Sequence, residues 1–163
     1  MPRKFKSTEQ FLMPDPRYGS RLLSKFINSV MLSGRKSTAR KAVYDAMDLI
    51  ASRLPGEDPM KVFNDAIGNV RPRVEVRSKR VGGANYQVPV EVSHRRQQAL
   101  AFRWILEVAR RSRRGRPFYV ALADEFMAAY RREGGAFTKR ENVHKMADAN
   151  KAYAHYATLV GGL

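Results

Sequence analysis

Few side chains in this sequence could carry catalysis or bind a metal. The three histidines, His94, His144 and His155, do not have the spacing of metal ligands, and no serine or threonine has a recognisable base partner. The chain contains no cysteine, which excludes disulfides, thiolate nucleophiles and cysteine-based zinc sites. We therefore expect neither an enzyme nor a site for a metal, a cofactor or a small-molecule substrate.

The chemistry that the composition favours is electrostatic. Lys and Arg number 31 against 15 Asp and Glu, which gives a formal net charge of +16. Charge of one sign at this level destabilises a compact chain unless a partner neutralises it. Nucleic acid is the partner class that this balance favours. An anionic membrane surface is the weaker alternative, because no basic amphipathic helix stands apart from a core.

The apolar residues predict a core and no membrane span. No apolar run approaches the length needed to cross a membrane, and residues 1–6 lack the apolar segment of a signal peptide. With 163 residues and 44% hydrophobic content, the chain is long enough to bury a core as one domain. We expect a soluble protein of the cytoplasm.

The strongest strand pattern lies in residues 71–92. Valines alternate with polar residues on both sides of Gly82-Gly83, which is typical of a β-hairpin. We predict a hairpin over 73–92 with a three-residue loop, Gly82 to Ala84. That loop would pair Val76 with Val90 and Val74 with Val92 on one apolar face.

Cations cover the rest of this hairpin. An isolated hairpin is marginal in water, so an apolar base with a cationic tip favours a binding arm that a polyanion orders. Tyr86 is the best candidate for stacking on a base. The cations are Arg71 and Arg73 at the root and Arg77, Lys79 and Arg80 beyond Val76.

A second cationic surface is predicted on a helix from the cap Ser93 to about Arg113. Glu107 is the only carboxylate between residues 92 and 123, whereas a solvated helix face normally interleaves charges of both signs. At 1.5 Å per residue the stripe is about 27 Å long, and it favours phosphate binding. On a helical wheel it consists of Arg96, Arg103, Arg110 and Arg114, flanked by Arg95, Arg111 and Arg113.

The remaining periodicity is helical. We predict helices from the cap Ser20 to Gly34, from Ser37 to Pro55, from the cap Asp58 to Pro72, from Pro117, and from a capping box at Thr138–Glu141. The expected fold is mainly α: a single domain of about six helices, with one protruding basic β-hairpin between helices three and four. Residues 20–156 form this domain, preceded by a basic arm at 1–19 and followed by a tail at 157–163.

The residues alone do not choose between RNA and DNA. A DNA-architectural protein could insert a basic β-arm into the minor groove and bend the duplex. Such a protein usually needs two arms and therefore a dimer, so the oligomeric state would discriminate.

The hairpin sequence resembles a known signature. Residues 71–92, Arg-Pro-x-Val-Glu-Val-Arg-Ser-x-Arg-Val-Gly-Gly-Ala-x-Tyr-Gln-Val-Pro-Val-Glu-Val, are similar to that of the seventh protein of the small ribosomal subunit, in its bacterial or organellar form. Residues 12–18, 25–28, 34–37, 95–104 and 139–156 extend the resemblance in order along the chain.

This resemblance implies a primary binder of small-subunit ribosomal RNA that nucleates assembly of the subunit head and supports translation. It implies a place at the subunit interface, with the hairpin near the exit-site tRNA and the mRNA exit path, beside the eleventh small-subunit protein. The RNA-binding residues expected from the patterns and the resemblance together are Arg3, Lys4, Lys6, Lys25, Asn28, Arg35, Lys36, Arg71, Arg73, Arg77, Lys79, Arg80, Tyr86, Arg95, Arg96, Arg103, Arg110, Arg111 and Arg114, with Gly82 and Gly83 forming the turn.

Overall fold

A bundle of helices surrounds a cluster of phenylalanines in the computed structural model, which describes residues 9–159. Phe26 contacts Phe63, Phe102 and Phe126, with ring centroids 5.6, 5.2 and 5.4 Å apart. Each of these four rings comes from a different helix, so the cluster joins most of the bundle. In chain order the helices are α1 (Arg21–Val30), α2 (Lys36–Arg53), α3 (Pro59–Val70), α4 (His94–Arg111), α5 (Phe118–Tyr130) and α6 (Gly134–Ala149).

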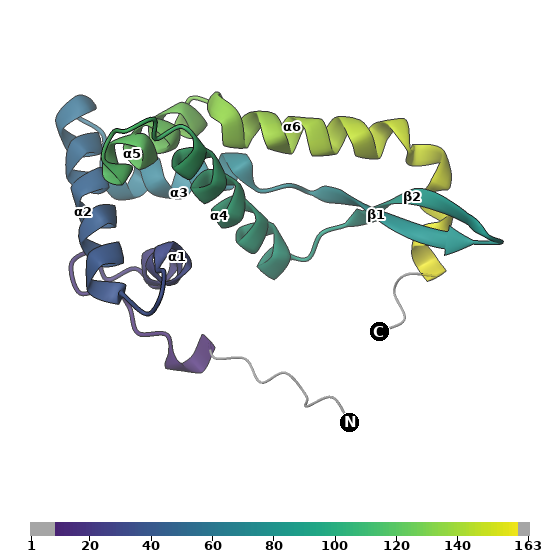
Figure 1. The fold of residues 1–163 in the computed structure, drawn as a ribbon, viewed down its shortest axis with the longest axis horizontal. Coiled ribbons are helices and arrows are strands. Elements are labelled where there is room, and N and C mark those ends of the chain that lie inside the picture. Colours follow the sequence, from purple (N-terminus) through teal and green to yellow (C-terminus); the bar gives the residue numbers. More distant parts are fainter. Residues whose placement is uncertain (1–8, 160–163) are drawn as a thin grey trace.

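The hairpin of β1 (Val74–Val81) and β2 (Ala84–Glu91) protrudes from this bundle between α3 and α4, as predicted. Helix α6 leaves the bundle and runs beside the hairpin (Figure 1). Two short 3-10 segments, η1 (Glu9–Phe11) and η2 (Lys151–Leu159), lie at the two ends of the described chain. The predicted fold class is confirmed.

Local sequence fixes the first helices. The Ser20 hydroxyl accepts a hydrogen bond from the backbone N–H of Leu23, and the Asp58 carboxylate accepts one from Met60, so these two predicted caps are confirmed. Ser93 precedes α4 as predicted, but its side chain makes no capping hydrogen bond. Pro59 occupies the first position of α3, where its missing N–H costs nothing. The buried residues of α2 and α3 recur at the spacing of one helix face, which agrees with the helical periodicity of these segments.

The predicted start of helix six is wrong. Helix α6 begins at Gly134, and Thr138 lies inside it, where its hydroxyl donates to the Gly134 carbonyl. The cap comes instead from α5: the Glu125 carboxylate accepts the Ala136 N–H at 2.7 Å. Two consecutive glycines, Gly134 and Gly135, allow this junction. Gly134 has φ +88°, and a Cβ on Gly135 would lie 2.8 Å from Val108.

The predicted register of the hairpin is also wrong. The loop has two residues, Gly82 and Gly83, and it pairs Val76 with Pro89 and Arg77 with Val88. Both glycines have positive φ, +57° and +90°, as in the turns whose twist matches paired strands. One face therefore carries Glu75, Arg77 and Lys79 together with Val88 and Tyr86. The three-residue loop was predicted because it keeps the valines together on one face, whereas the observed pairing mixes apolar and charged side chains on one face.

Candidate nucleic-acid interface

Lys25 and Arg103 face a groove between α1 and α4 with a volume of about 790 Å³. Phe26 of α1 packs on Phe102 of α4, which sets these helices side by side. Lys25 directly precedes Phe26 and Arg103 directly follows Phe102, so both cations lie at this contact. The Lys25 ammonium donates to the Gln98 side chain at 3.4 Å, which holds it at the groove. Arg110 and Arg111 line the same groove, and Glu107 is the only carboxylate among its lining residues. Such a surface suits a chain of phosphates.

The end of the predicted arginine stripe differs from the expectation. Helix α4 ends at Arg111, and Arg114 has φ +42°, so it follows a turn and does not continue the stripe. Arg114 lines a second groove of about 570 Å³ between α4 and α6, with Arg111, Arg116 and Lys139. Arg116 and Lys139 were not among the predicted residues. Lys139 reaches this groove because α6 packs on α4, and Arg116 lies in the turn after α4, where it pairs with Asp124 of α5 at 3.0 Å.

The hairpin is tied to α4 by a buried carboxylate. Glu75 accepts hydrogen bonds from the Nε of Arg77 at 2.7 Å and of Arg96 at 2.8 Å. The glutamate is 8% exposed, and this pairing compensates for its burial. Glu75 lies on β1 and not on α4, so the charges of α4 alone did not reveal it as a partner of Arg96. The arginine stripe of α4 is therefore partly neutralised at Arg96. Both arginines keep nearly half of their side-chain surface exposed.

Segment η2 covers the middle of the hairpin. The ring of Tyr86, for which we predicted base stacking, lies 5.2 Å from the ring of Tyr153 and 5.4 Å from that of Tyr156. Val88 on the same face is fully buried. This cover explains why the mixed face is stable.

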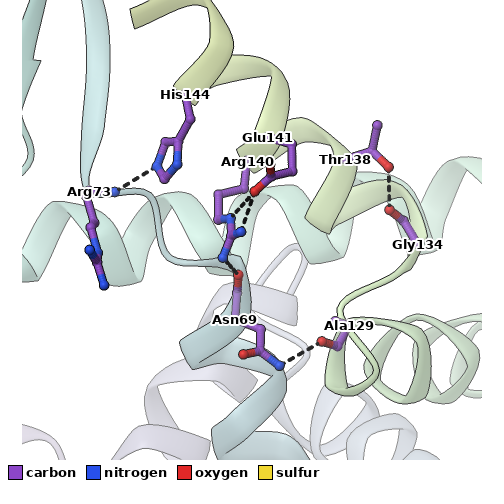
Figure 2. A network of polar contacts seen from close by, with 8 residues as sticks. All are labelled: Asn69, Arg73, Ala129, Gly134, Thr138, Arg140, Glu141 and His144. Carbon is purple, nitrogen blue, oxygen red and sulfur yellow. Dashed lines mark hydrogen bonds and ion pairs between the residues drawn. The ribbon is translucent and has the colours of Figure 1, made fainter. Parts of the chain in front are cut away.

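Polar contacts from α6 hold the root of the hairpin (Figure 2). The His144 Nε2 accepts the backbone N–H of Arg73 at 3.1 Å. Burial, followed by the charge of Arg140, lowers the pKa of His144, which favours the neutral ring that this bond requires. Arg140 donates to the Asn69 carbonyl at 2.7 Å, and the Asn69 amide donates to the Ala129 carbonyl at 3.0 Å. Helices α3, α5 and α6 thus fix the direction of the arm.

The other predicted cations lie around these surfaces. Arg35 and Lys36 are exposed at the start of α2, where no side chain caps the helix. Arg71 lies 3.3 Å from the His94 ring at the hairpin root. The side chains of Asn28, Arg73, Arg80 and Arg95 are exposed, and Lys79 is half-buried. Arg3, Lys4 and Lys6 lie outside the described residues.

Within residues 9–159 the side chains do not suggest a metal centre: no three or more His, Asp or Glu residues gather in a way that could hold an ion. In the same part of the chain, no helix is long and apolar enough to cross a membrane. What the described surface offers is two cationic grooves and a cationic arm.

Comparison with known proteins agrees with this picture. Residues 2–151 match the family described as ribosomal protein S7p/S5e. The small ribosomal subunit protein uS7 of Rhodopirellula baltica is 54% identical over 155 residues, which cover 94% of this chain and 98% of that protein. The proteins of the same name from Sulfurovum sp. and Carboxydothermus hydrogenoformans are 51% and 52% identical, over 94% and 96% of this chain and 98% and 99% of their own lengths.

Proposed function

We propose that this chain, which belongs to the ribosomal protein S7p/S5e family, binds ribosomal RNA as a structural constituent of the small ribosomal subunit. The observation that carries the proposal is the groove between α1 and α4, in which Lys25, Arg103, Arg110 and Arg111 face one carboxylate. A net charge of +16 adds long-range attraction to a polyanion.

Affinity and specificity have different sources in this arrangement. Each Lys or Arg that neutralises a phosphate releases counterions, so the affinity falls as salt rises. Side chains cannot read the deep major groove of an RNA helix, so specificity comes from shape. The fixed angle between the α1–α4 groove and the hairpin supplies that shape, because Glu75 and His144 tie the hairpin to α4 and α6.

Finer parts of the proposal follow from the family resemblance. We place the RNA site in the head of the subunit, where binding of this protein precedes that of others and nucleates assembly. The hairpin then lies near the exit-site tRNA and the mRNA exit path, with the eleventh small-subunit protein as a neighbour. The exposed side chains of Arg77 and Arg80 support a contact of the arm with nucleic acid.

The test is a filter-binding titration of the full chain against a transcript of the head domain of small-subunit ribosomal RNA. A length-matched DNA duplex serves as competitor, at two salt concentrations. We expect RNA binding to survive the competitor at the higher salt. Arg103→Gln should lower the affinity and reduce the slope of log K against log salt by about one unit.

The matched control is Lys61→Gln, which removes one positive charge from an exposed site on α3 that pairs with Glu57. It should change the slope less than Arg103→Gln does. Equal affinity for RNA and DNA that collapses with salt would contradict the proposal, and a dimer in solution would then favour the DNA-architectural alternative.

A further inference from the structure

An apolar cleft lies next to the cationic α1–α4 groove. Its volume is about 390 Å³, and it is bounded by the end of α1, the first turns of α2 and the start of α5. Leu32 at its side is 64% exposed. The apolar lining consists of Val30, Leu32, Ala39, Ala42 and Phe118.

Arginines also line this cleft, and none of its lining residues is acidic. Arg35 comes from α2, Arg110 from α4 and Arg113 from the turn after α4. Backbone carbonyls hold two of them in place: Arg110 donates to Val30 at 3.3 Å and Arg113 to Arg116 at 2.8 Å. The charge around the cleft therefore fits an anion with an apolar part, and two of its cations are already oriented.

Arg110 connects the cleft to the proposed RNA site. It lines both the cleft and the α1–α4 groove, so a strand whose phosphates follow Lys25, Arg103 and Arg110 passes the mouth of the cleft. A nucleotide at that point can turn its base into the apolar space and keep its phosphate beside the arginines.

We propose that this cleft binds one unstacked base of the RNA strand that occupies the α1–α4 groove. The inference rests on the proposed function and deepens it, because the groove selects for charge and shape while the cleft selects for an unpaired nucleotide. Proteins recognise RNA sequence mostly at such unpaired bases. An unpaired base has the two properties of this site, an apolar face and an adjoining phosphate.

The experiment fills the cleft without changing any charge. Ala42→Leu places a larger apolar side chain in the cleft, at a half-buried position of α2 that has room for it. Because the filled cleft no longer admits the base, we expect the affinity for the head-domain transcript to fall about tenfold, which corresponds to about 1.4 kcal/mol. The slope against log salt should stay unchanged, because no phosphate contact is lost.

The matched control is Ala51→Leu, the same substitution at an exposed position near the other end of α2. Chemical probing of bases in the complex gives the direct reading: wild type and Ala51→Leu should protect one unpaired base that Ala42→Leu leaves reactive. Circular dichroism verifies that both variants are folded.

The outcomes separate the two proposals. If Arg103→Gln weakens binding while Ala42→Leu binds within twofold of wild type and protects the same bases, the base site is refuted and the RNA groove stands. If wild type binds the DNA duplex as tightly as the transcript and both affinities collapse as salt rises, the proposed function itself fails. Normal RNA binding with poor incorporation of Ala42→Leu into subunits would assign the cleft to a protein neighbour and also refute the base site.

Discussion

Glu125 gives the sharpest test of how the fold positions its arm. This carboxylate on α5 is 7% exposed and accepts the Ala136 N–H at the first turn of α6. The N–H groups at the start of a helix have no partner within the helix. Since α6 carries Arg140 and His144, which hold the hairpin root, the stability of this junction bears on RNA binding.

Two substitutions separate the hydrogen bond from the charge. Glu125→Gln keeps an acceptor oxygen at the same place, whereas Glu125→Ala leaves the Ala136 N–H buried without one. A buried donor that loses its acceptor costs about 1–3 kcal/mol. We therefore expect the alanine variant to be less stable than the glutamine variant by about 2 kcal/mol, or about 4–8 °C in Tm for a chain of this size.

The pH dependence gives the second reading. Burial raises the pKa of Glu125 above the ordinary glutamate value, against the opposing effect of the backbone N–H groups of Ala136 and Gly135. Below the ordinary pKa the carboxyl is protonated in both the folded and the unfolded chain. As pH rises through the interval up to the native pKa, the unfolded chain ionises first, so the free energy of unfolding decreases. Glu125→Gln has no ionisable carboxyl at this position, so its free energy of unfolding lacks this decrease.

Urea unfolding followed by the fluorescence of Trp104, the only tryptophan, measures both effects. As pH rises from about 4 towards neutral, the free energy of unfolding of wild type should decrease relative to that of Glu125→Gln. Equal stability of the glutamine and alanine variants would refute the capping role. A difference between wild type and Glu125→Gln that does not vary with pH would refute the raised pKa.

Two further predictions concern the arm. Gly83→Val places a β-branched residue at φ +90°, so we expect the pairing of Arg77 with Val88 to be lost while the helices persist. Cross-strand nuclear Overhauser effects report on the pairing, and circular dichroism reports on the helices. An intact register in this variant would contradict the turn assignment. Tyr86→Ala removes two ring contacts, with Tyr153 and Tyr156, worth about 0.5–1.5 kcal/mol each. We therefore expect amide hydrogen exchange in residues 151–157 to become roughly tenfold faster. Unchanged exchange would show that these rings do not hold η2 on the hairpin.

Local sequence was sufficient for the helical body and most of the cations. The caps Ser20 and Asp58 act through hydrogen bonds to residues two or three positions away, so their capping role can be predicted without knowledge of the fold. The buried faces of α2 and α3 follow from helical periodicity in the same way. Arg103 and Arg110 share a face because both lie on one regular helix, α4.

Contacts between distant segments decided the rest. The hairpin register depended on η2, whose tyrosines cover a face that looked too polar to bury, and on Arg96, which neutralises Glu75. The start of α6 depended on a carboxylate 11 residues earlier in the chain, on another helix.

Both grooves and the apolar cleft likewise need side chains from separate elements. The sequence by itself determined which residues are cationic, which are apolar and where most helices begin, because these properties are set within one or two turns of chain. Only the tertiary structure decided which of them face a common partner, because burial and charge pairing are properties of neighbours in space.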